Sequence, residues 1–184
     1  MITIEGYHGT DLECANNIIK TGFTYTPSDK HWLGNGIYFY LDFSLAEWWT
    51  TNPSNSFGTR VQYPAIVKTT IDFSEDDQYL DLRKLSDYKI FSELYFDEYI
   101  PLVESGVYDI KMTDTKRLRC SFCDYLKYQY DLKGIIGNFS SQNQRYFSDK
   151  YKHLQKSLKL YYIETQLCVF DTKCITSKEL CMLK

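Results

Sequence analysis

The chain has 184 residues, of which 43% are hydrophobic and 17% aromatic, and its formal net charge at pH 7 is -3. This length and apolar content suffice for the core of one domain and leave little room for a second, so a single domain over residues 1–184 is expected. The negative charge argues against a surface coated with phosphate-binding cations.

The first predicted unit is a strand followed by a helix and a turn. The strand carries the sequence His8-Gly9-Thr10, residues 11–20 have apolar side chains at helical spacing, and Gly22 is placed as a C-terminal stop. A glycine directly after a histidine lets a ligand approach the backbone closely, because glycine has no side chain and tolerates unusual dihedral angles. Such a strand can hold an amide group.

The second predicted unit is a strand with the sequence Gly34-Asn35-Gly36-Ile37-Tyr38-Phe39, again followed by a helix. Ser44 and Glu47 have the spacing of a capping box, which predicts the start of that helix. Tyr38 can stack on a flat ligand ring from one side, and Trp49 on the helix can cover the other side.

The middle and the end of the chain alternate helices and strands. Pro64 favours a strand start or an edge strand, and the predicted elements are a strand over 61–71, helices over 81–100 and 113–130, and strands over 132–137 and 157–170. Strands at both ends with helices between them predict an α+β fold of two packed sheets.

Three blocks of this sequence resemble a known family: His8-Gly9-Thr10, the block from Gly34 to Phe39, and Gln166-Leu167-Cys168-Val169-Phe170-Asp171. They are similar to the motifs of the poly(ADP-ribose) polymerase-like, His-Tyr-Glu type branch of the ADP-ribosyltransferase superfamily. The resemblance is at residue level over about residues 5–52 and 158–176 and architectural between them. It implies a split two-sheet β-sandwich with flanking helices, with NAD as co-substrate and no metal.

The resemblance also implies roles for individual residues. The Gly9 backbone would hold the nicotinamide carboxamide, the His8 side chain the adenine-side ribose, and Thr10 would support the turn. Tyr38 and Trp49 would enclose the nicotinamide ring. The residues expected to bind the cofactor are therefore His8, Gly9, Thr10, Gly36, Tyr38 and Trp49.

The late strand departs from the family pattern, because Gln166 stands where the catalytic glutamate is usual. Glu164 precedes it by two residues, and side chains at that spacing on a strand point to the same face. Either Glu164 supplies the charge that stabilises an oxocarbenium-like state while Gln166 orients the ribose, or Gln166 alone occupies the position. Both are expected to be catalytic residues, together with His8 and Tyr38.

The expected function is NAD-dependent mono-ADP-ribosyl transfer with release of nicotinamide. Loss of the usual glutamate disfavours chain elongation, and the alternatives are a catalytically inactive NAD- or ADP-ribose-binding module and an NAD glycohydrolase. Because the chain carries no apparent leader or membrane span, a cytoplasmic protein without membrane contact is expected. A compact transferase of this kind resembles toxin-type enzymes of toxin-antitoxin or phage-defence systems, which implies an inhibitory antitoxin partner.

The acceptor is expected to be a macromolecule, either a protein or single-stranded RNA or DNA. The second half interleaves cations and tyrosines, which favours nucleic acid: Lys116, Arg117, Arg119, Lys127, Arg145, Lys150, Lys152, Lys156 and Lys159 with Tyr125, Tyr128, Tyr130, Tyr146 and Tyr151. The net charge favours protein. A loop over 138–148 is a candidate acceptor contact. The six cysteines fit buried thiols, and Cys120-Ser121-Phe122-Cys123 lacks the second ligand pair of a zinc site.

Overall fold

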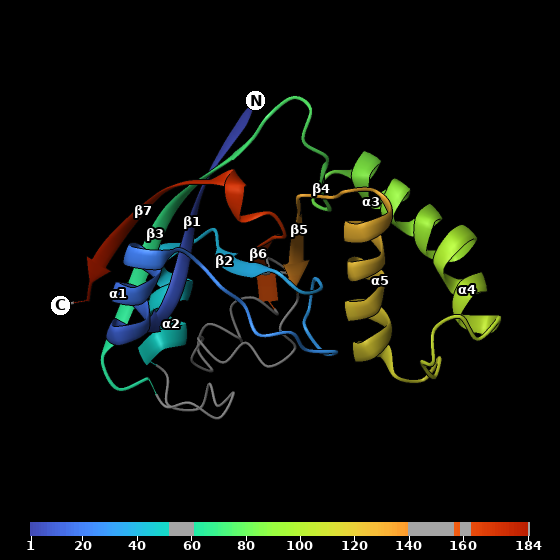
Figure 1. Ribbon diagram of the computed structural model, residues 1–184, viewed down its shortest axis with the longest axis horizontal. Coiled ribbons are helices and arrows are strands. Elements are labelled where there is room, and N and C mark those ends of the chain that lie inside the picture. Colours follow the sequence, from blue (N-terminus) through green and yellow to red (C-terminus); the bar gives the residue numbers. More distant parts are fainter. Residues whose placement is uncertain (52–60, 140–156, 159–162, 184) are drawn as a thin grey trace.

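The computed structural model describes residues 1–51, 61–139, 157–158 and 163–183, and it has an α+β architecture built on one seven-stranded sheet (Figure 1). The strand order is β4-β5-β6-β2-β1-β3-β7. The strands are β1 (Ile2–Asp11), β2 (Ile37–Tyr40), β3 (Pro64–Phe73), β4 (Tyr79–Asp81), β5 (Gly134–Phe139), β6 (Glu164–Val169) and β7 (Ile175–Met182). Only β4 and β5 pair in parallel; the other pairings among these strands are antiparallel.

The expected α+β class is confirmed, but the strands form a single sheet where two packed sheets were predicted. The pairing within the sheet is narrow, limited to one residue pair, between β1 and β2. β1 pairs with β3 along its whole length, whereas β1 and β2 share the single residue pair Tyr7↔Tyr40. This junction divides the sheet into one part made of β7, β3 and β1 and another made of β2, β6, β5 and β4.

The first predicted helix is confirmed as α1 (Leu12–Thr21). Asp11 caps it, because its side chain accepts a hydrogen bond from the backbone N–H of Glu13 at 3.2 Å. Gly22 ends it with a φ of 93° and donates its N–H to the carbonyl of Ile18, a conformation that favours glycine. Thr10 was expected to support a turn, but it lies within β1 and pairs with Ala65.

The second helix, α2 (Phe43–Thr51), begins earlier than the predicted capping box. The side chain of Asp42 accepts a hydrogen bond from the N–H of Ser44 at 2.8 Å, so Ser44 lies in the first turn and does not cap the helix. The capping-box prediction was wrong because an aspartate two residues earlier takes the same role.

The two helices cover opposite faces of β1. Leu12, Ile18 and Ile19 of α1 pack in the core with Phe39. On the other face, Phe43 of α2 contacts the ring of Tyr7 edge-on at 5.5 Å. Because side chains alternate along a strand, the residues of β1 and β2 are divided between these two faces.

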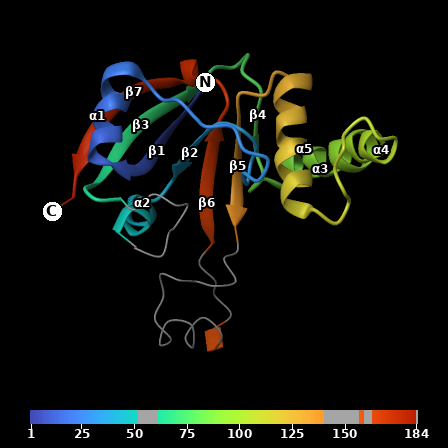
Figure 2. The same cartoon turned by 60° about the horizontal axis from the view of Figure 1, so that its bottom comes forward.

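The helical part of the molecule lies beyond β5 (Figure 1). The helix predicted over 81–100 is confirmed from Leu85 onward, where α3 (Leu85–Glu93) continues through a π-helical turn (Leu94–Tyr99) into α4 (Ile100–Glu104), while Asp81 belongs to β4. The second predicted helix is confirmed as α5 (Thr115–Gln129), which lies beside β5 (Figure 2). Tyr99 and Phe122 pack between these helices with ring centroids 5.2 Å apart.

The strand predictions hold in part. The strand predicted over 61–71 is β3, which starts at Pro64; of the two alternatives for Pro64, a strand start is confirmed, and the edge strand is wrong because β3 lies between β1 and β7. β6 begins at Glu164, whereas residues 157 and 158, predicted as strand, are helical. β4 and β7 were not predicted, since neither has the apolar alternation that marks a half-buried strand.

The apolar core falls into two clusters, one on each face of the sheet. The α1 side holds Phe23, Phe39, Phe73 and Leu167, and the α5 side holds Leu33, Tyr99, Phe122 and Leu126. All six cysteines are free thiols; four are buried as expected, Cys181 is partly buried and Cys14 is exposed. Among the described residues, no helix is long and apolar enough to span a membrane.

Candidate functional site

The predicted site residues gather around the junction of β1 and β2. Continuing the antiparallel register from Tyr7↔Tyr40 places Gly9 opposite Tyr38, on the side of the sheet that α2 covers. β6 pairs with β2 and places Gln166 beside Tyr40. Glu164 lies two residues from Gln166 on the same strand, so its side chain points to the same side of the sheet. We call this side, which Gly9, Tyr38, Gln166 and Glu164 share, the α2 face.

Glu164 and Gln166 are in direct contact on this face. The side-chain amide of Gln166 donates a hydrogen bond to the carboxylate of Glu164. Gln166 lies between Tyr40 on β2 and Gly137 on β5, and Glu164 lies beside Phe139. The amide therefore orients the carboxylate, which is the arrangement expected if Glu164 carries the charge.

The side chain of Tyr38 is held by two hydrogen bonds at its hydroxyl. Its hydroxyl accepts a hydrogen bond from the N–H of Leu33 at 2.6 Å and donates one to the carbonyl of Gly34 at 2.8 Å. Burial raises the pKa of this hydroxyl far above its usual range, so Tyr38 stays neutral. A ring held in this way loses little further freedom when a ligand stacks on it.

Gly9 is the point at which α2 packs on β1. A Cβ atom there would lie 2.8 Å from the Ala46 carbonyl and 2.7 Å from Cγ2 of Thr50. Trp49 is close by, with its Cε3 atom 3.4 Å from the same position. The structure thus brings Trp49 to the Gly9 end of the α2 face.

Gly36 has a packing role. A Cβ atom at this position would meet Sγ of Cys168 and the carbonyl of Val169, both at 2.6 Å. These contacts belong to the pairing of β2 with β6. The absence of a side chain at Gly36 therefore lets the strand that carries Tyr38 approach the strand that carries Glu164 closely, and its cofactor-binding role stays a prediction.

His8 lies on the opposite face from Tyr38. Its ring contacts Phe23 and Phe39 edge-on, with centroids 5.3 and 6.0 Å apart. Nδ1 of His8 lies 2.8 Å from the carbonyl oxygen of Tyr38, so the ring bridges β1 and β2 where their pairing is narrow. Burial lowers the pKa of His8, so the imidazole is neutral at pH 7 and Nδ1–H donates to that carbonyl.

Two residues that the sequence analysis did not connect with the predicted site, Trp32 and Arg119, lie at the other end of the α2 face. The indole of Trp32 contacts Phe139, the neighbour of Glu164, with centroids 5.1 Å apart. The guanidinium carbon of Arg119 on α5 lies 3.9 Å from the centre of the Trp32 ring. No local pattern marked Trp32, because its neighbours in space come from α5 and β5.

The segment that carries Trp32 is tied to α5 by Asn35. The backbone N–H and the side-chain amide of Asn35 both donate to the carboxylate of Asp124, at 2.7 and 2.6 Å. Oδ1 of Asn35 accepts from the N–H of Ser28 at 2.8 Å. These bonds hold the segment in place above the end of β2.

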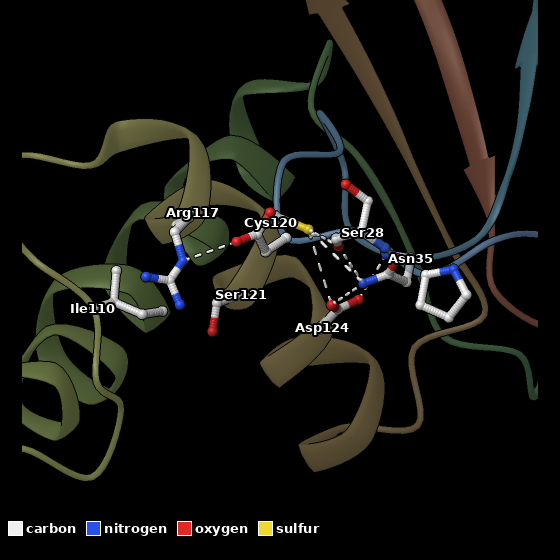
Figure 3. A pocket seen from close by; sticks show the side chains of 9 residues that line it. Ser28, Asn35, Ile110, Arg117, Cys120, Ser121 and Asp124 are labelled. Carbon is white, nitrogen blue, oxygen red and sulfur yellow. Dashed lines mark hydrogen bonds and ion pairs between the residues drawn. The ribbon is translucent and has the colours of Figure 1, made fainter. Parts of the chain in front are cut away.

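Beside this network is a cavity of about 440 Å³, drawn in Figure 3. Arg117, Cys120 and Asp124 of α5 line it together with Ser28 and Asn35. None of the predicted cofactor or catalytic residues lines this cavity. It lies between α5 and the Ser28–Asn35 segment, and neither Tyr38 nor Glu164 lines it.

Three of the four predicted acceptor-binding cations on α5 make contacts within the protein. Arg117 pairs with Asp29 at 3.1 Å, Arg119 stacks on Trp32, and Lys127 donates to the carbonyl of Asn35 at 3.0 Å. Only Lys116 is exposed without such a contact among the described residues. The other predicted cations and two tyrosines lie outside the described residues: Arg145, Lys150, Lys152, Lys156, Lys159, Tyr146 and Tyr151.

Other predicted features are distributed as follows. Within the described part of the chain no group of histidine, cysteine and acidic side chains has the arrangement of a metal site. Cys120 donates to the carbonyl of Ser28 at 3.2 Å, and burial raises the pKa of its thiol to about 11. Of the candidate acceptor loop over 138–148, Asn138 and Phe139 belong to β5, and residues 140–148 lie outside the described residues.

Comparison with known proteins identifies no family. No protein-family model matches the chain, and no solved structure matches it. It is similar to the uncharacterized protein MJ0359 of Methanocaldococcus jannaschii, with 27% identity over 139 residues. The match covers 75% of this chain and 56% of MJ0359, so the chain spans little more than half the length of that relative.

Proposed function

We propose that the chain is an NAD-dependent mono-ADP-ribosyltransferase whose active site is the α2 face at the junction of β1 and β2. The observation that carries the proposal is the meeting of Tyr38 and Gly9 with the Glu164–Gln166 pair, which comes from the far end of the sequence. Aromatic rings near a carboxylate suit a ligand that joins a flat aromatic cation to a sugar.

The chemistry follows from these side chains. Tyr38 and Trp49 enclose the nicotinamide ring, and the Gly9 backbone receives its carboxamide. The bond between ribose and nicotinamide breaks with its electron pair leaving on the nicotinamide nitrogen, and the carboxylate of Glu164 stabilises the positive charge that develops on the ribose. A nucleophile of the acceptor then bonds to the ribose carbon and loses its proton.

His8 acts as a positioning residue in this proposal. Its hydrogen bond to the Tyr38 carbonyl holds β2 against β1, so it sets the place of the Tyr38 ring from the opposite face. The narrow junction that His8 bridges corresponds, in our proposal, to the split between the two halves of the ADP-ribosyltransferase fold. Because Gln166 stands where the catalytic glutamate is usual, a single transfer is favoured over chain elongation.

The proposed setting is that of a toxin-type effector that an antitoxin restrains, acting on a macromolecular acceptor. We favour a protein acceptor, because most of the α5 cations make contacts within the molecule. Growth arrest on expression of the chain alone, relieved by Tyr38→Ala, is the expected behaviour of such an effector.

The decisive experiment measures NAD binding by calorimetry and nicotinamide release by chromatography. The wild-type chain should bind NAD and release nicotinamide, and Tyr38→Ala should weaken binding about tenfold or more, since one stacked ring is worth about 1–3 kcal/mol. Tyr88→Ala, at an exposed position on α3, is the matched control and should change neither quantity. Binding without release supports an inactive NAD-binding module, and release with no labelled acceptor supports an NAD glycohydrolase.

A further inference from the structure

Arg119 differs from the other cations of α5 in its surroundings. Its guanidinium carbon lies 3.9 Å above the Trp32 ring, and its Nε atom is buried without a hydrogen-bond partner among the described residues. Trp32 keeps 47% of its surface exposed, so the stacked pair stands at the protein surface. A guanidinium presents five donors in a planar fork, and the stack on Trp32 fixes the plane of that fork.

Two acidic side chains on or beside α5 are engaged with other groups. Asp29 pairs with Arg117 at 3.1 Å, and Asp124 accepts both hydrogen bonds from Asn35. Burial lowers the pKa of Arg119, which means that the charged form is partly desolvated, yet a guanidinium keeps its charge at neutral pH. The indole face offsets part of this cost, and an anion would offset more.

The position of Arg119 at one end of the α2 face indicates what kind of anion it could bind. Trp32 contacts Phe139, and Phe139 is the strand neighbour of Glu164. Gly9 and Trp49 lie at the other end of the same face, on the far side of β2 and β6. From β1 to β5 there are three strand spacings, or about 14 Å, so a ligand that reaches both ends is longer than a nicotinamide ring.

We propose that Arg119, held on Trp32, is the phosphate subsite of the α2 face and binds the diphosphate of a dinucleotide ligand. This inference rests on the proposed function, because NAD supplies both the ring for Tyr38 and the diphosphate for Arg119. Two phosphate oxygens accept parallel hydrogen bonds from the guanidinium fork. Trp32 acts as the support that orients the fork, and neither residue takes part in bond cleavage.

The test compares ligand binding by the wild-type chain, R119Q and K116Q, measured by calorimetry with ADP, inorganic pyrophosphate and NAD. Lys116 is an exposed cation on the same helix and serves as the matched control. R119Q should weaken ADP and NAD binding about tenfold or more, as expected for loss of hydrogen bonds to a charged group, and K116Q should change them less than about twofold. Raising the salt concentration should weaken ADP binding by the wild type more than by R119Q.

The outcomes separate this inference from the proposed function. If ADP binds the wild type and not R119Q while no nicotinamide is released, the phosphate subsite stands and the transferase activity does not. If R119Q cleaves NAD with an unchanged KM, the activity stands and the subsite is wrong. Wild type that binds neither ADP nor pyrophosphate also overturns the subsite.

Circular dichroism and thermal melting show whether R119Q is folded. If R119Q is not folded, R119K tests the same proposal, because the ammonium group of lysine keeps the charge but cannot form the planar fork on Trp32. R119K should bind ADP about threefold or more weakly than the wild type, and equal affinity would overturn the proposal.

Discussion

At the scale of single residues, the Glu164–Gln166 pair carries the chemistry of the proposed site. The amide of Gln166 donates to the carboxylate of Glu164, so the glutamine is used to hold its neighbour. The sequence left two assignments open: Glu164 supplies the charge while Gln166 orients the ribose, or Gln166 alone takes the position of the catalytic glutamate. The contact between the two side chains favours the assignment in which Glu164 supplies the charge.

This assignment predicts unequal effects of substitution on nicotinamide release. Glu164→Gln keeps the shape and removes the charge, so kcat should fall about a hundredfold or more, as for loss of one preorganised stabilising group. Gln166→Ala should lower kcat less, because the carboxylate remains. Near-normal turnover of Glu164→Gln together with an inactive Gln166→Ala would reverse the roles.

His8 gives the protein a pH-dependent stability. Burial lowers the pKa of its imidazole in the folded state, while in the unfolded chain the value is near 6.5. The unfolded state therefore binds more protons on acidification, and the stability contributed by the neutral ring is present above about pH 6.5 and lost as the pH falls below it.

The measurement is thermal unfolding of the wild type and His8→Gln between pH 7.5 and 5.5. The wild-type midpoint should fall as the pH is lowered. Over this range His8 lowers the free energy of unfolding by at most about 1.4 kcal/mol per pH unit. His8→Gln keeps a donor for the Tyr38 carbonyl and does not titrate, so its midpoint should depend less on pH. An equal dependence in both proteins would show that other groups set it.

At the scale of elements, close approach between β2 and β6 places Tyr38 near Gln166. Gly36 makes this possible, because a larger residue would meet Cys168 and the Val169 carbonyl at 2.6 Å. A backbone carbonyl within a ladder cannot move without disturbing the pairing of the strands. Gly36 of the Gly-x-Gly motif therefore supports the proposed site through packing.

Gly36→Ala should lower the free energy of unfolding by about 2 kcal/mol or more, the usual range for overpacking a filled site. Gly106→Asn is the matched control: Gly106 has a φ of 80°, no atom lies within 4 Å of its Cβ position, and asparagine tolerates that conformation. This control should cost about 1 kcal/mol or less. Chemical denaturation measures the free energy of unfolding of both variants. Similar losses in the two would contradict the packing role of Gly36.

At the scale of the whole molecule, our choice between the proposed acceptor classes rests on the surface of α5 and of the other helices beyond β5. Three cations that suggested a nucleic-acid surface make contacts within the protein, to Asp29, Trp32 and the Asn35 carbonyl. The exposed apolar side chains of the helical arm include Leu85, Tyr88 and Phe96. These features favour a protein acceptor over RNA or DNA.

Incubation of the full chain with labelled NAD and a cell lysate tests this expectation. The label should enter macromolecules, survive nuclease and disappear with protease. A second arm raises the salt concentration, which should affect labelling of a protein acceptor less than that of a nucleic acid, because phosphate contacts release counterions. Label that survives protease and disappears with nuclease would establish a nucleic-acid acceptor.

Local patterns in the sequence determined several features that the structure confirms. The α+β class, helix α1 with its glycine stop, helix α5 and the strand start at Pro64 depend on periodicity and on residues with restricted or unusual backbone angles. The alternation of Glu164 and Gln166 on one face also needed only the period of a strand. Such signals act within a few residues, so they can be recognised without knowing the fold.

Only the tertiary structure decided which distant residues meet. It placed His8 on the opposite face from Tyr38, joined the strands in one sheet with a narrow junction, and added β7 as a partner of β3. It also brought Arg119 onto Trp32 at the end of the face that holds Glu164. These contacts depend on burial and strand pairing between segments far apart in the chain, and no local pattern encodes such a choice of partner.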